Sequence, residues 1–192
     1  MSLILASNSQ IRRAMLEQAG LAFEIRSPAF DEDSAKREGL TGEQLVRVLA
    51  EGKAASLAED DAAWVIGSDS SAAVGGTSYS KPKDRKEAAA HLRAFSGQEM
   101  LLSSGVALAR RGQVQWSHAE TARLRFRELS DAFIEHYLDE EWPAVGYCVG
   151  VFRLEGRGVT LFETMAGNYF TILGMPLLPL LGELRSQGLM LS

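Results

Sequence analysis

The 192-residue sequence lacks the features that mark several classes of protein. It has one cysteine, Cys148, so an internal disulfide is excluded and a reducing compartment is expected. No run of residues approaches the ~20 apolar positions of a membrane-spanning helix. The N-terminus also lacks the basic-then-apolar order of a signal peptide. We therefore expect a cytoplasmic protein with no membrane partner.

An excess of basic charge is also missing. The chain has 20 Lys and Arg against 25 Asp and Glu, which leaves a formal net charge of -5. This balance argues against binding to a nucleic-acid polymer, although it leaves room for a small basic pocket. The three histidines (His91, His118 and His136) are too far apart to show metal-ligand spacing. No Walker loop, GxGxxG or GxSxG occurs.

What the sequence does contain is a regular alternation of apolar runs and helical patterns, with no internal repeat and no long linker. The runs predict strands at residues 3–6, 21–26, 64–69, 100–110 and 114–127. Helices are predicted over residues 12–18, 41–58, 84–95, 130–140 and 176–187, with capping boxes starting at Thr41 and Asp84. Residues 31–39, "DEDSAKREG", look like a charged loop, and Gly75 and Gly76 like a hairpin turn. The class is α/β, in one globular domain or two small lobes sharing a core.

Two adjacent arginines, Arg12 and Arg13, begin the first predicted helix in "LASNSQIRRAML". A helix N-terminus already carries free N–H groups and partial positive charge, so two cations there are unfavourable unless an anion binds. Ser7 and Ser9 lie just upstream and can donate hydroxyl groups. The segment therefore fits a phosphate cradle, and it equally fits a solvated pair of arginines on a surface helix.

Two further positions have both a chemical and a structural interpretation. Lys53 continues the apolar stripe of the second predicted helix, so its ammonium either points into a cleft or extends to water. Asp69 follows the apolar strand of "WVIGSD", and sites in α/β sheets gather at the carboxyl ends of strands. It could hold a metal or orient a water, or it could be an ordinary turn residue.

Weaker signals add to these. Asp31 and Glu32 form an acidic pair after a predicted strand, and Lys81 precedes Pro82. Each is compatible with a solvated face, and Cys148 lacks an evident base and reads as a packing residue. Taken together, these residues predict a nucleotide-phosphate site. Such a site needs cations that bind the phosphates and carboxylates that bind a divalent ion.

These segments, taken in order, resemble the Maf family of nucleoside triphosphate pyrophosphatases over nearly the whole chain. The family's Ser-x-x-Arg-Arg element falls at Ser9, Arg12 and Arg13, and its Asp-Glu pair at Asp31 and Glu32. Its Lys-Ala stands in "LAEGKAASLA", and its strand-end aspartate in "VIGSD". Its Lys-Pro segment matches "SKPKDRKEAAAHLRAFSGQ", and its closing segment "LEGRGVTLFETMAGNYFTILGMPLLPL".

The resemblance implies a single Maf-like domain over residues 1–192, with a fold like that of inosine triphosphate pyrophosphatases. That fold is a mixed twisted sheet with flanking helices and two lobes around a cleft. The implied reaction hydrolyses a nucleoside triphosphate to the monophosphate and pyrophosphate with Mg²⁺ or Mn²⁺. Members of the family often dimerise, so a homodimer is compatible with the resemblance.

The resemblance also assigns roles to residues of this chain. Asp69 is the expected catalytic base, and Glu32 together with Asp69 is expected to hold the metal. The substrate-binding residues implied are Ser7, Ser9, Arg12, Arg13, Lys53 and Lys81. A nucleotide-binding regulator without catalysis and an interaction protein with an acidic surface are the alternatives.

Base preference is expected to depend on Ile11, Ser70 and Glu155. Glu155 resembles the family branch that acts on 7-methyl-GTP, since dTTP- and UTP-cleaving members carry glutamine there. A carboxylate accepts hydrogen bonds and can take guanine's ring N–H and amino donors. The same branch tends to have an aromatic residue in place of Ile11 and glutamine in place of Ser70. These two departures leave the base preference open.

Overall fold

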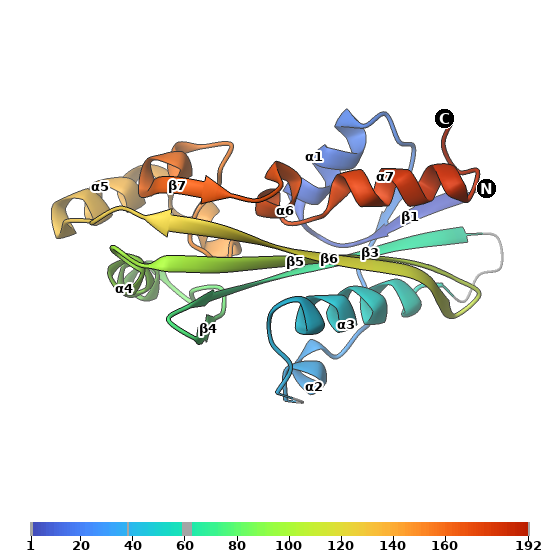
Figure 1. Ribbon diagram of the computed structural model, residues 1–192, viewed down its shortest axis with the longest axis horizontal. Coiled ribbons are helices and arrows are strands. Elements are labelled where there is room, and N and C mark those ends of the chain that lie inside the picture. The colour runs from blue at the N-terminus through green and yellow to red at the C-terminus, as the bar shows by residue number, and fades with distance from the viewer. Residues whose placement is uncertain (1, 38, 59–62, 192) are drawn as a thin grey trace. The chain divides into compact units, whose positions relative to one another are not determined.

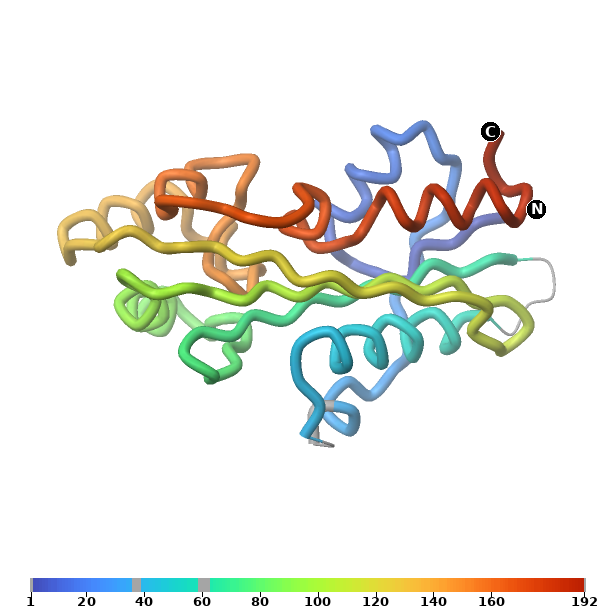
Figure 2. The backbone as a smooth tube through the Cα atoms, in the orientation of Figure 1, coloured from blue at the N-terminus to red at the C-terminus, as the bar shows by residue number. Residues whose placement is uncertain are grey.

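The computed structural model describes residues 2–37, 39–58 and 63–191. The chain groups into two compact units. The first unit comprises Met1–Ser70, Ser103–Glu120 and Asn168–Ser192, and the second comprises Ser71–Leu102 and Thr121–Gly167. Three long strands, β3 (Ala63–Val74), β5 (Glu99–Arg110) and β6 (Gln113–Phe126), contribute residues to both units. Figure 2 traces how the chain leaves the first unit along β3, returns along β5, leaves again along β6, and re-enters before its last helices.

The described residues form a seven-stranded mixed sheet in the order β2–β1–β3–β5–β6–β7, with β4 paired to β3. Strand β1 (Ser2–Ala6) runs parallel to both β2 (Glu24–Arg26) and β3. Strand β4 (Thr77–Tyr79) is antiparallel to β3, and β7 (Phe162–Ala166) is antiparallel to β6. The α/β class and the mixed sheet expected from the sequence are therefore confirmed.

In the first unit, helices cover both faces of the sheet (Figure 1). Helices α1 (Gln10–Gln18), α6 (Tyr169–Leu173) and α7 (Leu177–Ser186) lie on one side, and α2 (Glu32–Arg37) and α3 (Gly42–Ala55) on the other. Successive strand residues point to opposite faces, so each strand supplies two cores. Leu3, Leu5, Trp64 and Ile66 pack with α1 and α7, whereas Ile4, Ala6 and Val65 pack with the alanines of α3.

The second unit has an aromatic core. Tyr79, Phe95, Phe126, Phe162 and Phe152 form a chain of ring contacts with centroids 4.6 to 5.4 Å apart. Helices α4 (Arg85–Phe95) and α5 (Asp131–Glu141) are joined by ion pairs, and the 3₁₀ turns η1 (Ala144–Tyr147) and η2 (Arg157–Leu161) follow α5. This unit carries Lys81 and Glu155, to which the family resemblance assigns substrate binding and base preference, respectively.

Local patterns predicted several boundaries correctly. Gly75 and Gly76 turn the chain between β3 and β4, both with positive φ. Asp84 accepts a hydrogen bond from the backbone of Glu87 and begins α4, and Ser130 caps α5 in the same way. These features depend on contacts within three or four residues, which a sequence pattern records directly.

Other local predictions were wrong. Residues 31–39 are not all loop, because Glu32–Arg37 form α2. Thr41 precedes α3 but its side chain makes no capping hydrogen bond, and the helix ends at Ala55 rather than near residue 58. Asp69 does not follow the end of its strand, since β3 continues to Val74. The parallel pairing with β1 ends at Ala6 and Gly67, however, so Asp69 lies just beyond the parallel part of the strand.

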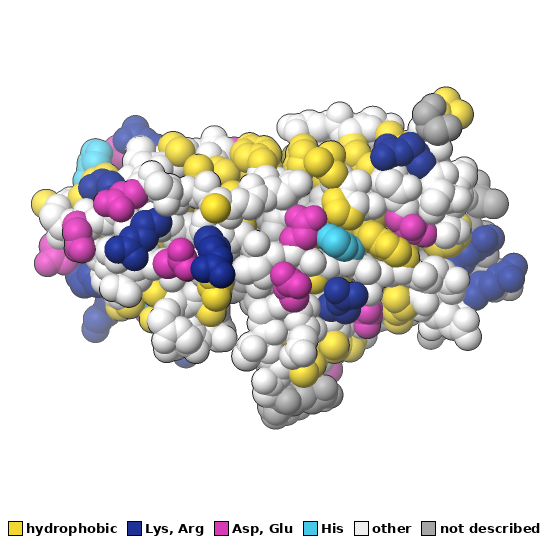
Figure 3. All heavy atoms as spheres, viewed as in Figure 1, with side chains coloured by type: hydrophobic (Ala, Val, Ile, Leu, Met, Phe, Trp, Pro, Cys, Tyr) yellow, Lys and Arg dark blue, Asp and Glu magenta, His cyan; other side chains and the backbone are white. Residues whose placement is uncertain are grey.

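Charged side chains of both signs are interspersed on the face shown in Figure 3. This distribution agrees with the small negative net charge of -5. Within the described ranges, none of the helices combines the length and apolar character needed to cross a bilayer.

Candidate active site

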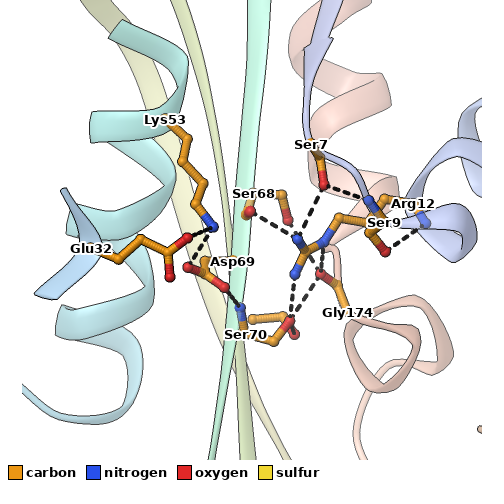
Figure 4. Close-up of polar contacts among 10 residues, drawn as sticks. Ser7, Ser9, Arg12, Glu32, Lys53, Ser68, Asp69, Ser70 and Gly174 are labelled. Atoms are coloured by element: carbon orange, nitrogen blue, oxygen red, sulfur yellow. Dashed lines mark hydrogen bonds and ion pairs between the residues drawn. The ribbon is translucent and has the colours of Figure 1, made fainter. Parts of the chain in front are cut away.

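Lys53 lies between two carboxylates in the first unit. Its Nζ is 2.8 Å from Asp69 Oδ2 and 2.8 Å from Glu32 Oε1. The lysine side chain is 10% exposed and that of Asp69 is 15% exposed, whereas Glu32 is 39% exposed. Figure 4 shows the three side chains converging from α3, β3 and the start of α2. Lys53 therefore does not extend to water, because its ammonium is enclosed by ion pairs with Glu32 and Asp69.

Two glycines allow this convergence. A Cβ on Gly67 would overlap the carbonyl oxygen of Ala50 and lie 2.5 Å from the nitrogen of Ala54, so α3 rests directly on the backbone of β3. A Cβ on Gly52 would overlap the ring of Phe30, so this ring packs directly against α3. Phe30 precedes the first residue of α2, Glu32, by two positions. The close approach at Gly67 brings Lys53 within reach of Asp69, and the approach at Gly52 brings Glu32 to the same helix.

Asp69 is held as a carboxylate. Burial raises its pKa, but the charges of Lys53 and Arg12, together with hydrogen bonds from Lys53 and from the backbone of Ser70, outweigh burial and leave the pKa below its ordinary value. The hydrogen bonds are 2.8 Å long from Lys53 Nζ and 2.7 Å from Ser70 N. Asp69 is consequently ionised at neutral pH, as a proton acceptor must be.

Arg12 lies on the other side of β3, surrounded by oxygen acceptors (Figure 4). Its Nε donates to the carbonyl of Gly174 at 3.0 Å, and Nη1 donates to the carbonyl of Ser68 at 3.0 Å. Nη2 donates to Ser70 Oγ at 3.0 Å. Planar guanidinium groups have donors in a fixed fork, so these acceptors set the orientation of Arg12.

The alternation of β3 separates the two groups. Asp69 faces Lys53 and α3, whereas its neighbours Ser68 and Ser70 face Arg12 and the turn at Gly174. The backbone N–H of Ser70 nevertheless donates to Asp69, which connects the two sides through one peptide. Lys53 and Arg12 therefore lie on opposite sides of the same strand.

The remaining residues at the start of α1 have different positions. Ser9 caps α1 and its hydroxyl accepts from the backbone N–H of Arg12, at 3.5 Å. Ser7 is buried, and its hydroxyl accepts from Ser9 N at 3.2 Å and from Arg12 Nη1 at 3.5 Å. Arg13 is outside this cluster, since its exposed guanidinium pairs with Glu17 Oε1 at 2.7 Å. Its contact with substrate stays a prediction.

The residues assigned to base preference are spread along the chain. Ile11 is half-buried on α1. Ser70 Oγ lies 3.1 Å from the carbonyl of Gly174 and 3.0 Å from Ser104 Oγ, so this hydroxyl belongs to the Arg12 cluster. Glu155 is exposed in a turn of the second unit, and Lys81 is exposed between β4 and α4. The roles of Glu155 and Lys81 stay predictions.

Four contributors to the Arg12 cluster were not identified from the sequence: Ser68, Ser104, Thr171 and Gly174. Ser68 and Gly174 act partly through backbone carbonyls, for which a sequence has no residue-type signal. Gly174 has φ +112° and ends α6. The sequence signal for this helix end is the glycine of "LGMP", two residues before the proline. Ser104 follows Ser103 in an apolar strand, where serines look like any small core residues.

The carboxylates of Glu32 and Asp69 suit a divalent cation whose remaining ligands come from the substrate. Within the described residues there is no group of three or more His, Cys, Asp and Glu side chains that could hold a metal on protein ligands alone. Mg²⁺ is commonly bound through one or two carboxylates together with substrate phosphates. Two carboxylates that meet at one ammonium supply that number of protein ligands.

Comparisons with known proteins identify relatives of this chain. A family model described as "Maf-like protein" matches residues 2–187. A 7-methyl-GTP pyrophosphatase of Rhizobium meliloti (strain 1021) is 45% identical over 97% of this chain and 96% of its own length. A nucleoside triphosphate pyrophosphatase of Nitrobacter winogradskyi is 44% identical over 98% of this chain and 95% of its own. A dITP/XTP pyrophosphatase structure from Mycobacterium abscessus aligns with TM-score 0.42 and 18% identity over 67% of this chain and 76% of its own, too low to support a conclusion.

Proposed function

Since the chain belongs to the Maf family, we propose that it is a nucleoside triphosphate pyrophosphatase, which releases pyrophosphate and leaves a nucleoside monophosphate. One observation carries the proposal beyond family membership. An ionised, largely buried Asp69 contacts Lys53 beside Glu32, and Arg12 lies on the opposite side of the same strand. A base and cations for a polyphosphate are thus brought together in one unit.

Asp69 is the proposed general base. It accepts a proton from a water molecule whose oxygen attacks the α-phosphorus, and the bond from that phosphorus to the bridging oxygen breaks as pyrophosphate leaves. In the structure Lys53 lowers the proton affinity of Asp69. When the ammonium of Lys53 turns to a phosphate oxygen, that stabilisation of the carboxylate weakens and Asp69 becomes a stronger base.

The cations provide charge for the triphosphate. Lys53 and Arg12 are the proposed contacts within the first unit, and Arg13 and Lys81 are proposed to add to them. A Mg²⁺ or Mn²⁺ ion held by Glu32 and Asp69 would neutralise charge on the phosphate oxygens. Ser7 and Ser9 support Arg12 and the start of α1 through the hydrogen bonds described above, and their own contact with substrate stays a prediction.

A guanine nucleotide, with 7-methyl-GTP as the first to test, is the proposed substrate. Two observations support it: residue 155 is a glutamate, whose carboxylate is the kind of group that accepts hydrogen bonds from guanine donors, and the relative from Rhizobium meliloti bears that substrate in its name. Other relatives bear the broader name of nucleoside triphosphate pyrophosphatase. The base is therefore the part of the proposal that a substrate panel must decide.

The deciding experiment assays pyrophosphate release from standard and modified nucleoside triphosphates with Mg²⁺ or Mn²⁺. We expect release that requires a divalent cation and is fastest with 7-methyl-GTP. Release of orthophosphate instead of pyrophosphate would contradict the reaction, and pyrimidine preference would contradict the base. Nucleotide binding without turnover would support the alternative of a regulator without catalysis.

A further inference from the structure

Thr171 on α6 connects the Arg12 cluster to a carboxylate that the proposed reaction does not use. The residue is fully buried, at 0% exposed. Its hydroxyl donates to Glu120 Oε2, and its carbonyl accepts from Ser104 Oγ at 2.9 Å. The side chain of Thr171 is therefore bonded to β6 and its backbone carbonyl to β5.

Glu120 is itself held in one orientation. Its second oxygen, Oε1, lies 3.1 Å from His118 Nε2, and the His118 ring stacks on Trp116 with centroids 6.0 Å apart and planes 7° apart. Trp116, His118 and Glu120 alternate along β6 and so lie on the same side of the strand. The carboxylate is 28% exposed, so one side of it reaches the surface of the first unit.

From Thr171 the contacts continue to Arg12 by two routes. Ser104 Oγ lies 3.0 Å from Ser70 Oγ, which accepts from Arg12 Nη2. The backbone N–H of Gly174 also donates to the carbonyl of Thr171 at 3.1 Å. The carbonyl of Gly174 accepts from Arg12 Nε at 3.0 Å. Every link in both routes is a hydrogen bond, and all of them belong to the first unit.

We propose that Glu120 and Thr171 are positioning residues for the nucleotide site: their hydrogen bond holds α6 so that the Gly174 carbonyl and Ser70 orient Arg12 toward the substrate. The role rests on the proposed function, since Arg12 is there a phosphate contact. An arginine that meets a polyphosphate must already point at it, because binding is weakened when a side chain has to be ordered first. The hydroxyl of Thr171 thus affects nucleotide affinity without touching the nucleotide.

The test compares Thr171→Val, which has nearly the same shape without the hydroxyl, with Thr171→Ser, which keeps it. We expect Thr171→Val to raise the KM for the nucleotide about tenfold with kcat changed less than about twofold, as for loss of one hydrogen bond that orders a binding residue. Thr171→Ser should return KM close to the wild-type value. Ser117→Ala is the control: Ser117 is on β6 three residues from Glu120 and donates to Glu51 instead, at 2.6 Å, so KM should not change.

A second readout does not depend on turnover. Arg12 Nε–H is bonded to a carbonyl, so its NMR signal should be resolved and slow to exchange in the wild type and in Thr171→Ser. It should broaden or exchange faster in Thr171→Val, which removes the donor of the Thr171–Glu120 hydrogen bond. The same change is expected in Glu120→Ala, which removes the acceptor.

These readouts separate the two proposals. An unchanged Arg12 signal in both Thr171→Val and Glu120→Ala would overturn the positioning role, and so would a KM rise in Ser117→Ala equal to that in Thr171→Val. If Thr171→Val does not fold, Glu120→Ala decides on its own. A wild-type protein with no turnover but an Arg12 signal sensitive to Thr171 would overturn the proposed function while leaving the ordering of Arg12 supported.

Discussion

Arg12 and Arg13 are neighbours in sequence and have opposite environments. The partial positive charge at the start of α1 disfavours both, and each finds a different compensation. The Arg12 guanidinium turns to carbonyl and hydroxyl oxygens, one of them 162 residues away in sequence at Gly174. Arg13 forms an exposed ion pair with Glu17 one turn along the same helix. The surface-helix interpretation therefore describes Arg13, whereas Arg12 turns inward to protein oxygens and its contact with phosphate stays a prediction.

Asp69→Asn should remove most of the activity and leave the fold intact. The amide cannot accept the proton from water, so we expect kcat to fall by about 10²–10⁴, the usual contribution of a general base. Lys53 keeps Glu32 as a partner in the variant, which limits the structural cost. Pyrophosphate release and circular dichroism measure the two effects. Asp139→Asn, which alters an exposed carboxylate paired with Arg85, is the control and should turn over normally.

Glu155→Gln should change the choice of base more than the rate of the preferred reaction. A glutamine side chain presents one acceptor and one donor group, so guanine loses a charge-assisted acceptor and pyrimidines gain a donor. We expect the ratio of kcat/KM for guanine over pyrimidine triphosphates to fall about tenfold. Equal ratios in the variant and the wild type would show that Glu155 does not read the base. Glu163→Gln, on exposed β7, supplies the matched control.

At the scale of elements, the packing of α3 on the sheet sets the distance between Lys53 and Asp69. Gly67 and Gly105 both face α3, and a Cβ at either position would overlap helix backbone. The residues of α3 that face the sheet are also small, since Ala50 and Ala54 are fully buried against β1 and β3. An apolar stripe predicts such a helix, but how closely it approaches depends on the strand that it meets.

Gly67→Ala should therefore destabilise the protein and disturb the site together. The added methyl group pushes α3 away from β3, and overpacking of this kind typically costs about 1–3 kcal/mol. Urea unfolding should show the loss, and turnover should fall because Lys53 moves away from Asp69. The control is Gly182→Ala within α7, where the nearest atom to the new Cβ is Arg185 Nη2 at 4.0 Å. That exchange should stabilise by about 0.5–1 kcal/mol through helix propensity.

At the scale of the whole molecule, stability should depend on the charge of Asp69. Its pKa is lower in the folded chain than its ordinary value of 3.8, so the ionised form stabilises the fold at neutral pH. That stabilisation is present above the unfolded pKa and is lost as pH falls through the folded pKa.

The wild type should be more stable than Asp69→Asn at pH 7, and the difference should shrink as the pH falls from about 5 to below 3.8, since the asparagine has no proton to bind. Urea unfolding of both proteins across this range measures it. A gap that stays constant with pH would mean that the charge of Asp69 does not contribute. Asp139→Asn again serves as the comparison for an exposed carboxylate.

The sequence by itself determined the features that depend on near neighbours. The α/β alternation, the hairpin at Gly75 and Gly76, and the caps at Asp84 and Ser130 follow from interactions between residues a few positions apart, and these leave a readable pattern. Tertiary structure alone decided that Lys53 meets both Glu32 and Asp69, that Arg12 turns inward while Arg13 does not, and that Thr171 contacts Glu120. The physical reason is that these contacts join separate elements, so they depend on how closely a helix or turn packs against the sheet and not on any residue type alone.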